Sequence, residues 1–81
     1  MNETSTPNNK TVKAVVVFPR IGSSVTGTVY DQIVTISGGM KLFTSIGEIE
    51  INPSEVACRA WSAGNGYNYD MKDGRGISIF W

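Results

Sequence analysis

Short runs of β-branched and aromatic residues recur along this chain, and segments rich in glycine, proline or asparagine separate them. β-Branched and aromatic residues favour strands, and pairs such as Gly38-Gly39 favour hairpin turns. The pattern predicts a mainly β fold, all-β or β-dominated α+β, with about five to seven strands in a small bent antiparallel sheet or barrel. The expected strands cover residues 12–18, 25–30, 33–36, 40–46, 48–51, 67–71 and 77–81.

The length of the chain limits the size of its core. It has 81 residues, enough for one domain, and such a domain buries only about 60% of the surface that the unfolded chain exposes. Residues 1–11 contain no large apolar side chain after Met1, so we expect a flexible tail followed by a single domain over residues 12–81. With one cysteine and no histidine, the chain cannot form an internal disulfide and has no Cys/His cluster for structural zinc. Oligomerisation remains as a source of extra stability.

The segment 53–62 departs from the strand pattern. Asn52 suits a helix N-cap, Pro53 suits the first helical position, and Glu55 lies where a capping box places its acid. These residues predict one short helix near residues 53–62. The alternative interpretation is a strand with alternating small and apolar side chains, namely Val56, Cys58 and Ala60.

The residue types that usually support catalysis or metal binding are scarce. The chain has no histidine to activate Cys58, for which we expect a buried structural role. Glu48 and Glu50 alternate with isoleucines, which predicts a solvated strand face; only two carboxyl groups converging in one cleft would suggest a glycosidase-like enzyme. Asp70 and Asp73 lack the spacing of an EF-hand loop. The sequence predicts a protein that is not an enzyme and has neither a metal site nor a cofactor.

The charge and hydropathy of the sequence limit the kinds of partner that the protein is expected to bind and its expected location in the cell. Seven basic and seven acidic residues give a formal net charge of zero, whereas proteins that bind duplex DNA usually have a basic excess. Residues 14–18 form the longest apolar run, far shorter than the roughly 20 residues of a membrane-spanning helix. The first residues are polar and contain no signal-peptide core. We therefore expect a cytoplasmic protein without a membrane role.

Two apolar strands predict contacts with another protein. The expected strand 77–81 has no charged residue, although exposed edge strands are usually protected by charge or proline. The strand 12–18 is apolar on both faces, which is typical of a central strand or an interface. The alternative is that the two strands pair within one closed sheet. The predicted interface residues are Val15, Val17, Ile79, Phe80 and Trp81.

These observations predict a non-enzymatic protein-binding or assembly module, expected to be a homo-oligomer. A small accessory or inhibitor protein, of the kind that viruses and mobile elements encode, fits this description. The alternative function is single-stranded nucleic-acid binding, because aromatic rings beside cations on a β surface can stack bases. The residues for this alternative are Tyr67, Tyr69, Lys72 and Arg75.

Overall fold

The computed structural model describes residues 11–35, 38–61 and 65–81, and these residues form a mainly β fold, as predicted. The expected tail therefore lies almost wholly outside the described residues. Seven strands and one short 3-10 helix follow one another along the chain. They are β1 (Ala14–Phe18), β2 (Val25–Val34), β3 (Met40–Thr44), β4 (Gly47–Ile51), η1 (Pro53–Glu55), β5 (Val56–Trp61), β6 (Gly66–Met71) and β7 (Gly76–Phe80).

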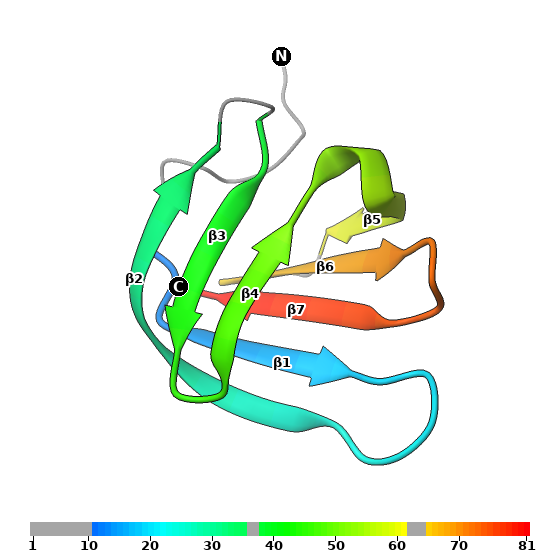
Figure 1. Cartoon of the computed structure of the whole chain (residues 1–81), viewed down its shortest axis with the longest axis horizontal. Coiled ribbons are helices and arrows are strands. Elements are labelled where there is room, and N and C mark those ends of the chain that lie inside the picture. Colours follow the sequence, from blue (N-terminus) through cyan, green and yellow to red (C-terminus); the bar gives the residue numbers. More distant parts are fainter. Residues whose placement is uncertain (1–10, 36–37, 62–64) are drawn as a thin grey trace.

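Strand β2 joins the two halves of the sheet. The strand order is β4-β3-β2-β1-β7-β6-β5, and the paired strands are antiparallel. Residues 25–28 of β2 pair with β1, and its later residues pair with β3. A β-bulge between Val29 and Asp31 separates these two parts. Because a bulge bends its strand and increases the twist, the sheet curls into a half-barrel with β3 and β4 in front of β1, β7 and β6 (Figure 1).

The core lies between the two halves of the curled sheet. Val15, Ile79 and Tyr67 lie opposite one another across β1, β7 and β6, and all three are buried. Residues at alternate positions of a strand share a face, so the next inward row contains Val17, Ile77 and Tyr69. The other half of the sheet covers these rows. The buried apolar residues are Val12, Val15, Met40, Leu42, Ile51, Tyr67, Tyr69, Met71, Ile77 and Ile79.

The helix predicted near residues 53–62 is not present in the described part of that segment. The capping signal is real, because the Asn52 side chain accepts a hydrogen bond from the Ser54 N–H at 3.1 Å. However, the turn ends after three residues, and Val56 is extended, with φ −91° and ψ 121°. From Val56 onward the chain pairs with β6, so pairing between strands overrides the local helix signal. The alternative prediction of a strand is confirmed, while residues 62–64 lie outside the described residues.

Gly39 lies where two strand ends approach most closely. A Cβ atom at this position would lie 2.1 Å from the Ile51 carbonyl oxygen and 2.8 Å from Pro53 Cδ. The neighbouring Gly38 adopts a φ of +89° and donates from its N–H to the Thr35 carbonyl oxygen at 3.0 Å. The predicted Gly38-Gly39 turn therefore both reverses the chain and allows β3 to pack against the end of β4.

We expect Gly39→Ala to lower the free energy of unfolding by about 3 kcal/mol, because the added methyl group must displace backbone rather than a flexible side chain. Gly47→Ala is the matched control. Gly47 has a φ of +105° but open space around it, so the cost there is conformational strain alone, about 1 kcal/mol. Urea denaturation of both variants measures the difference. Equal losses of unfolding free energy in the two variants would contradict the close approach of Gly39 to the Ile51 carbonyl oxygen.

Candidate functional site

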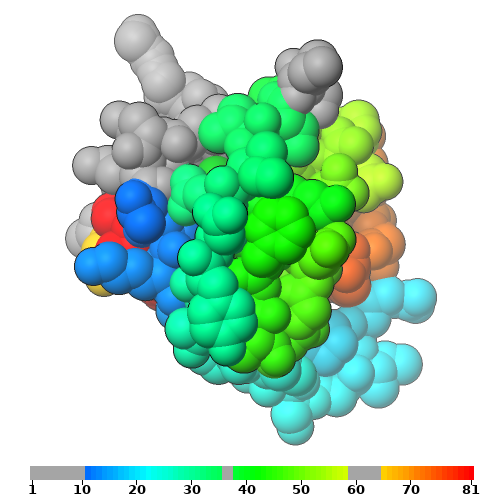
Figure 2. Space-filling view, turned by 60° about the vertical axis from the view of Figure 1, so that its left-hand side comes forward, coloured from blue at the N-terminus to red at the C-terminus, as the bar shows by residue number. Residues whose placement is uncertain are grey.

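The large exposed apolar side chains are concentrated in one stretch of the chain. Within the residues that the structure describes, all six of them lie between positions 18 and 34. Ile21, in the turn between β1 and β2, is 87% exposed, and Tyr30 is 71% exposed. Four belong to β2 itself, and we call them the β2 flank: Val25, Tyr30, Ile33 and Val34. Figure 2 shows the teal side chains of β2 in the foreground, next to the green side chains of β3.

The bulge in β2 places Tyr30 outside the regular ladder. Val29 pairs with Thr44 and Asp31 pairs with Phe43, so no residue of β3 lies opposite Tyr30. An extra residue of this kind is left unpaired and its side chain is redirected. The outcome is a large aromatic side chain near the middle of a ten-residue strand, mostly open to solvent.

Charged side chains of both signs lie beside the β2 flank. Lys41 lies opposite Ile33 in the register of β2 and β3. Its Nζ atom is 3.2 Å from Glu48 Oε1 and 5.9 Å from the centroid of the Phe43 ring. Both partners of this ion pair are considerably exposed, so it adds little to stability. The surface around the flank therefore combines apolar side chains with a few charges of opposite sign.

The predicted interface residues do not form one exposed surface. Val15 and Ile79 are fully buried and lie opposite each other in the β1–β7 pair, so their assignment to an interface is wrong in this conformation. Strand β7 lies inside the sheet between β1 and β6, which explains its lack of charge without a partner. Val17, Phe80 and Trp81 are half-buried, and their contact with a partner stays a prediction.

The proposed stacking surface for nucleic acid is not formed. Tyr67 is 3% exposed and Tyr69 is 1% exposed, and their rings contact each other edge to face with centroids 5.0 Å apart. They face the core because they lie in the same rows as Ile79 and Ile77. Lys72 is exposed and Arg75 is half-buried, and both lie between β6 and β7. The two tyrosine rings of β6 are buried, so neither cation lies beside an accessible ring. Bases therefore cannot stack on these two tyrosines.

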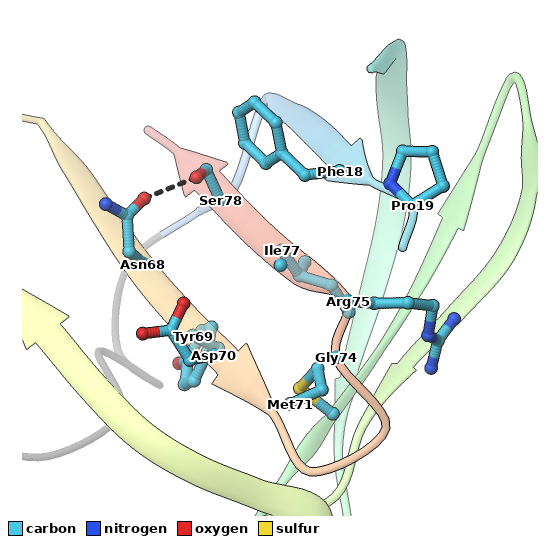
Figure 3. Close-up of a pocket in the computed structure, with 11 residues that line it drawn as sticks. Phe18, Pro19, Asn68, Tyr69, Asp70, Met71, Gly74, Arg75, Ile77 and Ser78 are labelled. Carbon is cyan, nitrogen blue, oxygen red and sulfur yellow. Dashed lines mark hydrogen bonds between the residues drawn. The ribbon is translucent and has the colours of Figure 1, made fainter. Parts of the chain in front are cut away.

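A hollow of about 480 Å³ opens on the outer side of the sheet, over β6 and β7 (Figure 3). The end of β1, strands β6 and β7 and the turn between them supply its lining. Because Asn68 lies opposite Ser78 and Asp70 lies opposite Gly76, these four residues share the outer face of the sheet. Phe18 lies opposite Gly76 on the other side, so its side chain belongs to the same face.

Two local contacts shape this hollow. A Cβ atom on Gly76 would lie 3.5 Å from Phe18 Cβ and Cδ2, so the Phe18 side chain covers the glycine closely. The Ser78 hydroxyl donates a hydrogen bond to Asn68 Oδ1, which fixes the orientation of the Asn68 carboxamide. The same surface thus combines a partly exposed aromatic ring with an oriented amide and the Asp70 carboxylate (Figure 3).

The β6–β7 turn at the end of the hollow holds a local ion pair. Arg75 Nε donates to Asp73 Oδ2 at 2.8 Å, and the Arg75 backbone N–H donates to Asp73 Oδ1 at 3.0 Å. The backbone N–H is the largest cause that holds the pKa of Asp73 below its ordinary value of 3.8. The Arg75 guanidinium and the charge of Arg20 act in the same direction.

The acidic side chains and Cys58 do not gather into a metal site in the described part of the chain. No group of three or more His, Cys, Asp or Glu side chains there could hold a metal ion. Cys58 is exposed on β5, not buried as expected. Glu48 and Glu50 are exposed on β4, and Glu48 pairs with Lys41. In the described residues, no helix is both long and apolar enough to cross a membrane.

Comparisons of the chain with protein-family models, with curated proteins and with solved structures gave no match. The β2 flank and the hollow are the two surfaces of the described structure that bear on function.

The lowered pKa of Asp73 predicts a pH-dependent contribution to stability. Because the folded pKa lies below the unfolded one, the charged Asp73 stabilises the fold above the unfolded pKa, and this contribution is lost as the pH falls through the folded value. Asp73→Asn keeps a side-chain oxygen that can accept from Arg75 but removes the charge. We expect the variant to unfold more easily than the wild type at neutral pH and to approach it as the pH falls below the folded pKa of Asp73. A difference in unfolding free energy that stays constant across this range would contradict the assignment.

Proposed function

We propose that this protein is a non-enzymatic assembly module in which two copies associate through their β2 flanks. The single observation that supports this function is the position of the exposed apolar side chains, four of which lie along one strand. Large apolar side chains left exposed on one element of a small protein are typical of a protein interaction site. A small accessory or inhibitor protein that self-associates fits this arrangement.

The charge of the chain favours a second copy as the occupant. A formal net charge of zero at pH 7 leaves little repulsion between two identical molecules. In a two-fold symmetric dimer the same patch faces itself, so each charge on one copy can meet an opposite charge on the other. Asp31 and Lys41 lie beside the flank on neighbouring strands and supply one charge of each sign.

The geometry of β2 suits a two-fold contact. Tyr30 lies near the middle of this ten-residue strand, at the bulge, where an extra residue leaves the regular ladder. An axis through the middle of the strand brings Tyr30 against its counterpart, with Ile33 nearby. Val34 lies opposite the buried Met40 and therefore belongs to the other face of β2. A standard interface covers about 800 Å² of each partner, about a sixth of the 4760 Å² accessible surface.

We expect the double variant Tyr30→Ser/Ile33→Ser to dissociate the dimer. A central exposed aromatic residue usually dominates such an interface, and its loss should weaken association by at least about thirtyfold. Size exclusion with light scattering over a range of protein concentrations measures the mass. Ile21→Ser is the matched control: it removes an even more exposed apolar side chain from outside the flank, and the dimer mass should stay unchanged.

Two results would overturn the proposal. The first is a wild-type protein that stays monomeric at every concentration. The second is a dimer that survives Tyr30→Ser/Ile33→Ser, and loss of that dimer on Trp81→Ser would move the interface to the end of the chain. Circular dichroism of each variant confirms that it is folded. A mass increase of a monomer only after a short single-stranded oligonucleotide is added at low salt would favour nucleic-acid binding instead.

A further inference from the structure

The hollow over β6 and β7 has no part in the proposed assembly. Its volume of about 480 Å³ lies within the range of small-molecule sites, which is about 300–1,000 Å³. Such sites combine apolar walls with a small number of placed polar groups. The hollow has this composition, because Phe18 and Pro19 lie at one side, Asn68 and Asp70 lie at the other, and Ser78 lies between them (Figure 3).

Phe18 supplies an accessible aromatic surface. It is 47% exposed, although its side chain packs against the backbone of Gly76. The absence of a side chain at Gly76 lets Phe18 lie close to the sheet, and the exposed part of its ring remains available to a flat ligand. An aromatic face offers apolar contact and weakly negative charge, and the C–H groups on one side of a sugar ring complement both.

Asn68 and Asp70 supply polar groups two residues apart on the same face of β6. The Ser78 hydroxyl engages Asn68 Oδ1, so the Nδ2 group points away from Ser78 and can donate to a ligand oxygen (Figure 3). The Asp70 carboxylate accepts hydrogen bonds only and is exposed to solvent. A hydroxyl group both donates and accepts, so neighbouring hydroxyls of one ligand can satisfy both side chains.

The charge of the hollow favours a neutral ligand. The charged residues that line it are Asp70 and Arg75, whose formal charges cancel. Arg75 is engaged with Asp73 and extends away from Asp70 (Figure 3), so it leaves the carboxylate available for hydroxyl groups. A strongly anionic ligand would meet the Asp70 carboxylate, and a cation would find only one acid and one aromatic ring.

We propose that this hollow binds a neutral saccharide, with one sugar ring against Phe18 and its hydroxyl groups on Asn68 and Asp70. The site is shallow and its polar groups are few, so it recognises one or two sugar units. This inference is independent of the assembly described above, because Tyr30 and Ile33 do not line the hollow.

The test is a titration of ¹⁵N-labelled protein with maltotriose, cellotriose and chitotriose, followed by NMR. At least one of the three should shift the backbone amides of residues 68–70 and 76–78 in a saturable way. Asp70→Asn removes the charged acceptor with little change of shape, and Phe18→Leu removes the ring but keeps an apolar cover over Gly76. Each should weaken binding by about tenfold.

Glu50→Gln is the matched control, because it removes an exposed carboxylate on β4 that does not line the hollow, and binding should be unchanged. Failure of all three sugars to shift these amides overturns the proposal, as do shifts that neither Asp70→Asn nor Phe18→Leu affects. Saturable shifts with tetramethylammonium but not with the sugars would assign a cation site instead. The same titration on the Tyr30→Ser/Ile33→Ser variant shows whether the sugars still bind when the two copies do not associate. A failure of sugar binding can therefore be distinguished from a failure of the assembly.

Discussion

The bend in β2 is the constraint on which the rest of the structure depends. A thin β sheet cannot bury a core against itself unless it curls, and here one strand pairs with β1 at one end and β3 at the other. The bulge between Val29 and Asp31 makes this change of direction. It closes the two halves over the core, and it also turns Tyr30 outward. The same irregularity thus supports the fold and creates the most prominent exposed aromatic residue of the described structure.

The position of each strand in the sheet, more than its composition, decides what its side chains do. Val15 and Ile79 are apolar and uncharged, and so they suggest an interface when the chain is considered segment by segment. In the folded sheet they lie opposite each other at its centre and contact the core. In contrast, Ile33 and Val34 have the same apolar character but remain about half exposed, because that part of β2 pairs with β3 and lies beyond its pairing with β1.

The runs of β-branched and aromatic residues and the turn residues between them are local properties of the sequence. Together with the length of the chain they were sufficient to predict a small, mainly β fold. The prediction of a helix near residues 53–62 was wrong. Asn52 and Pro53 do begin a helical turn, but the turn ends after Glu55 because the following residues pair with β6, and this pairing is not visible in the local sequence. The inward direction of Tyr67 and Tyr69 depends on register with β7, which no local pattern encodes. The hollow likewise requires Phe18 to meet Gly76 across 58 positions of sequence (76 minus 18). The break expected between strands 25–30 and 33–36 lies next to the bulge at which Tyr30 leaves the ladder, although β2 continues through it.

Association through the β2 flank would increase the avidity of the hollow for a repeating glycan. A shallow hollow with few polar groups binds a single sugar weakly, because little surface is removed from water and solvent competes for each hydrogen bond. A two-fold dimer presents two such hollows in a constant geometry, so the second contact with a repeating glycan becomes intramolecular. Avidity can then exceed the affinity of one site by about 100- to 10,000-fold without any new contact. Association through β2 leaves Asn68 and Asp70 uncovered, since they lie on β6, separated from β2 by β1 and β7. Assembly is therefore the step that would make weak recognition at the hollow effective on a multivalent surface.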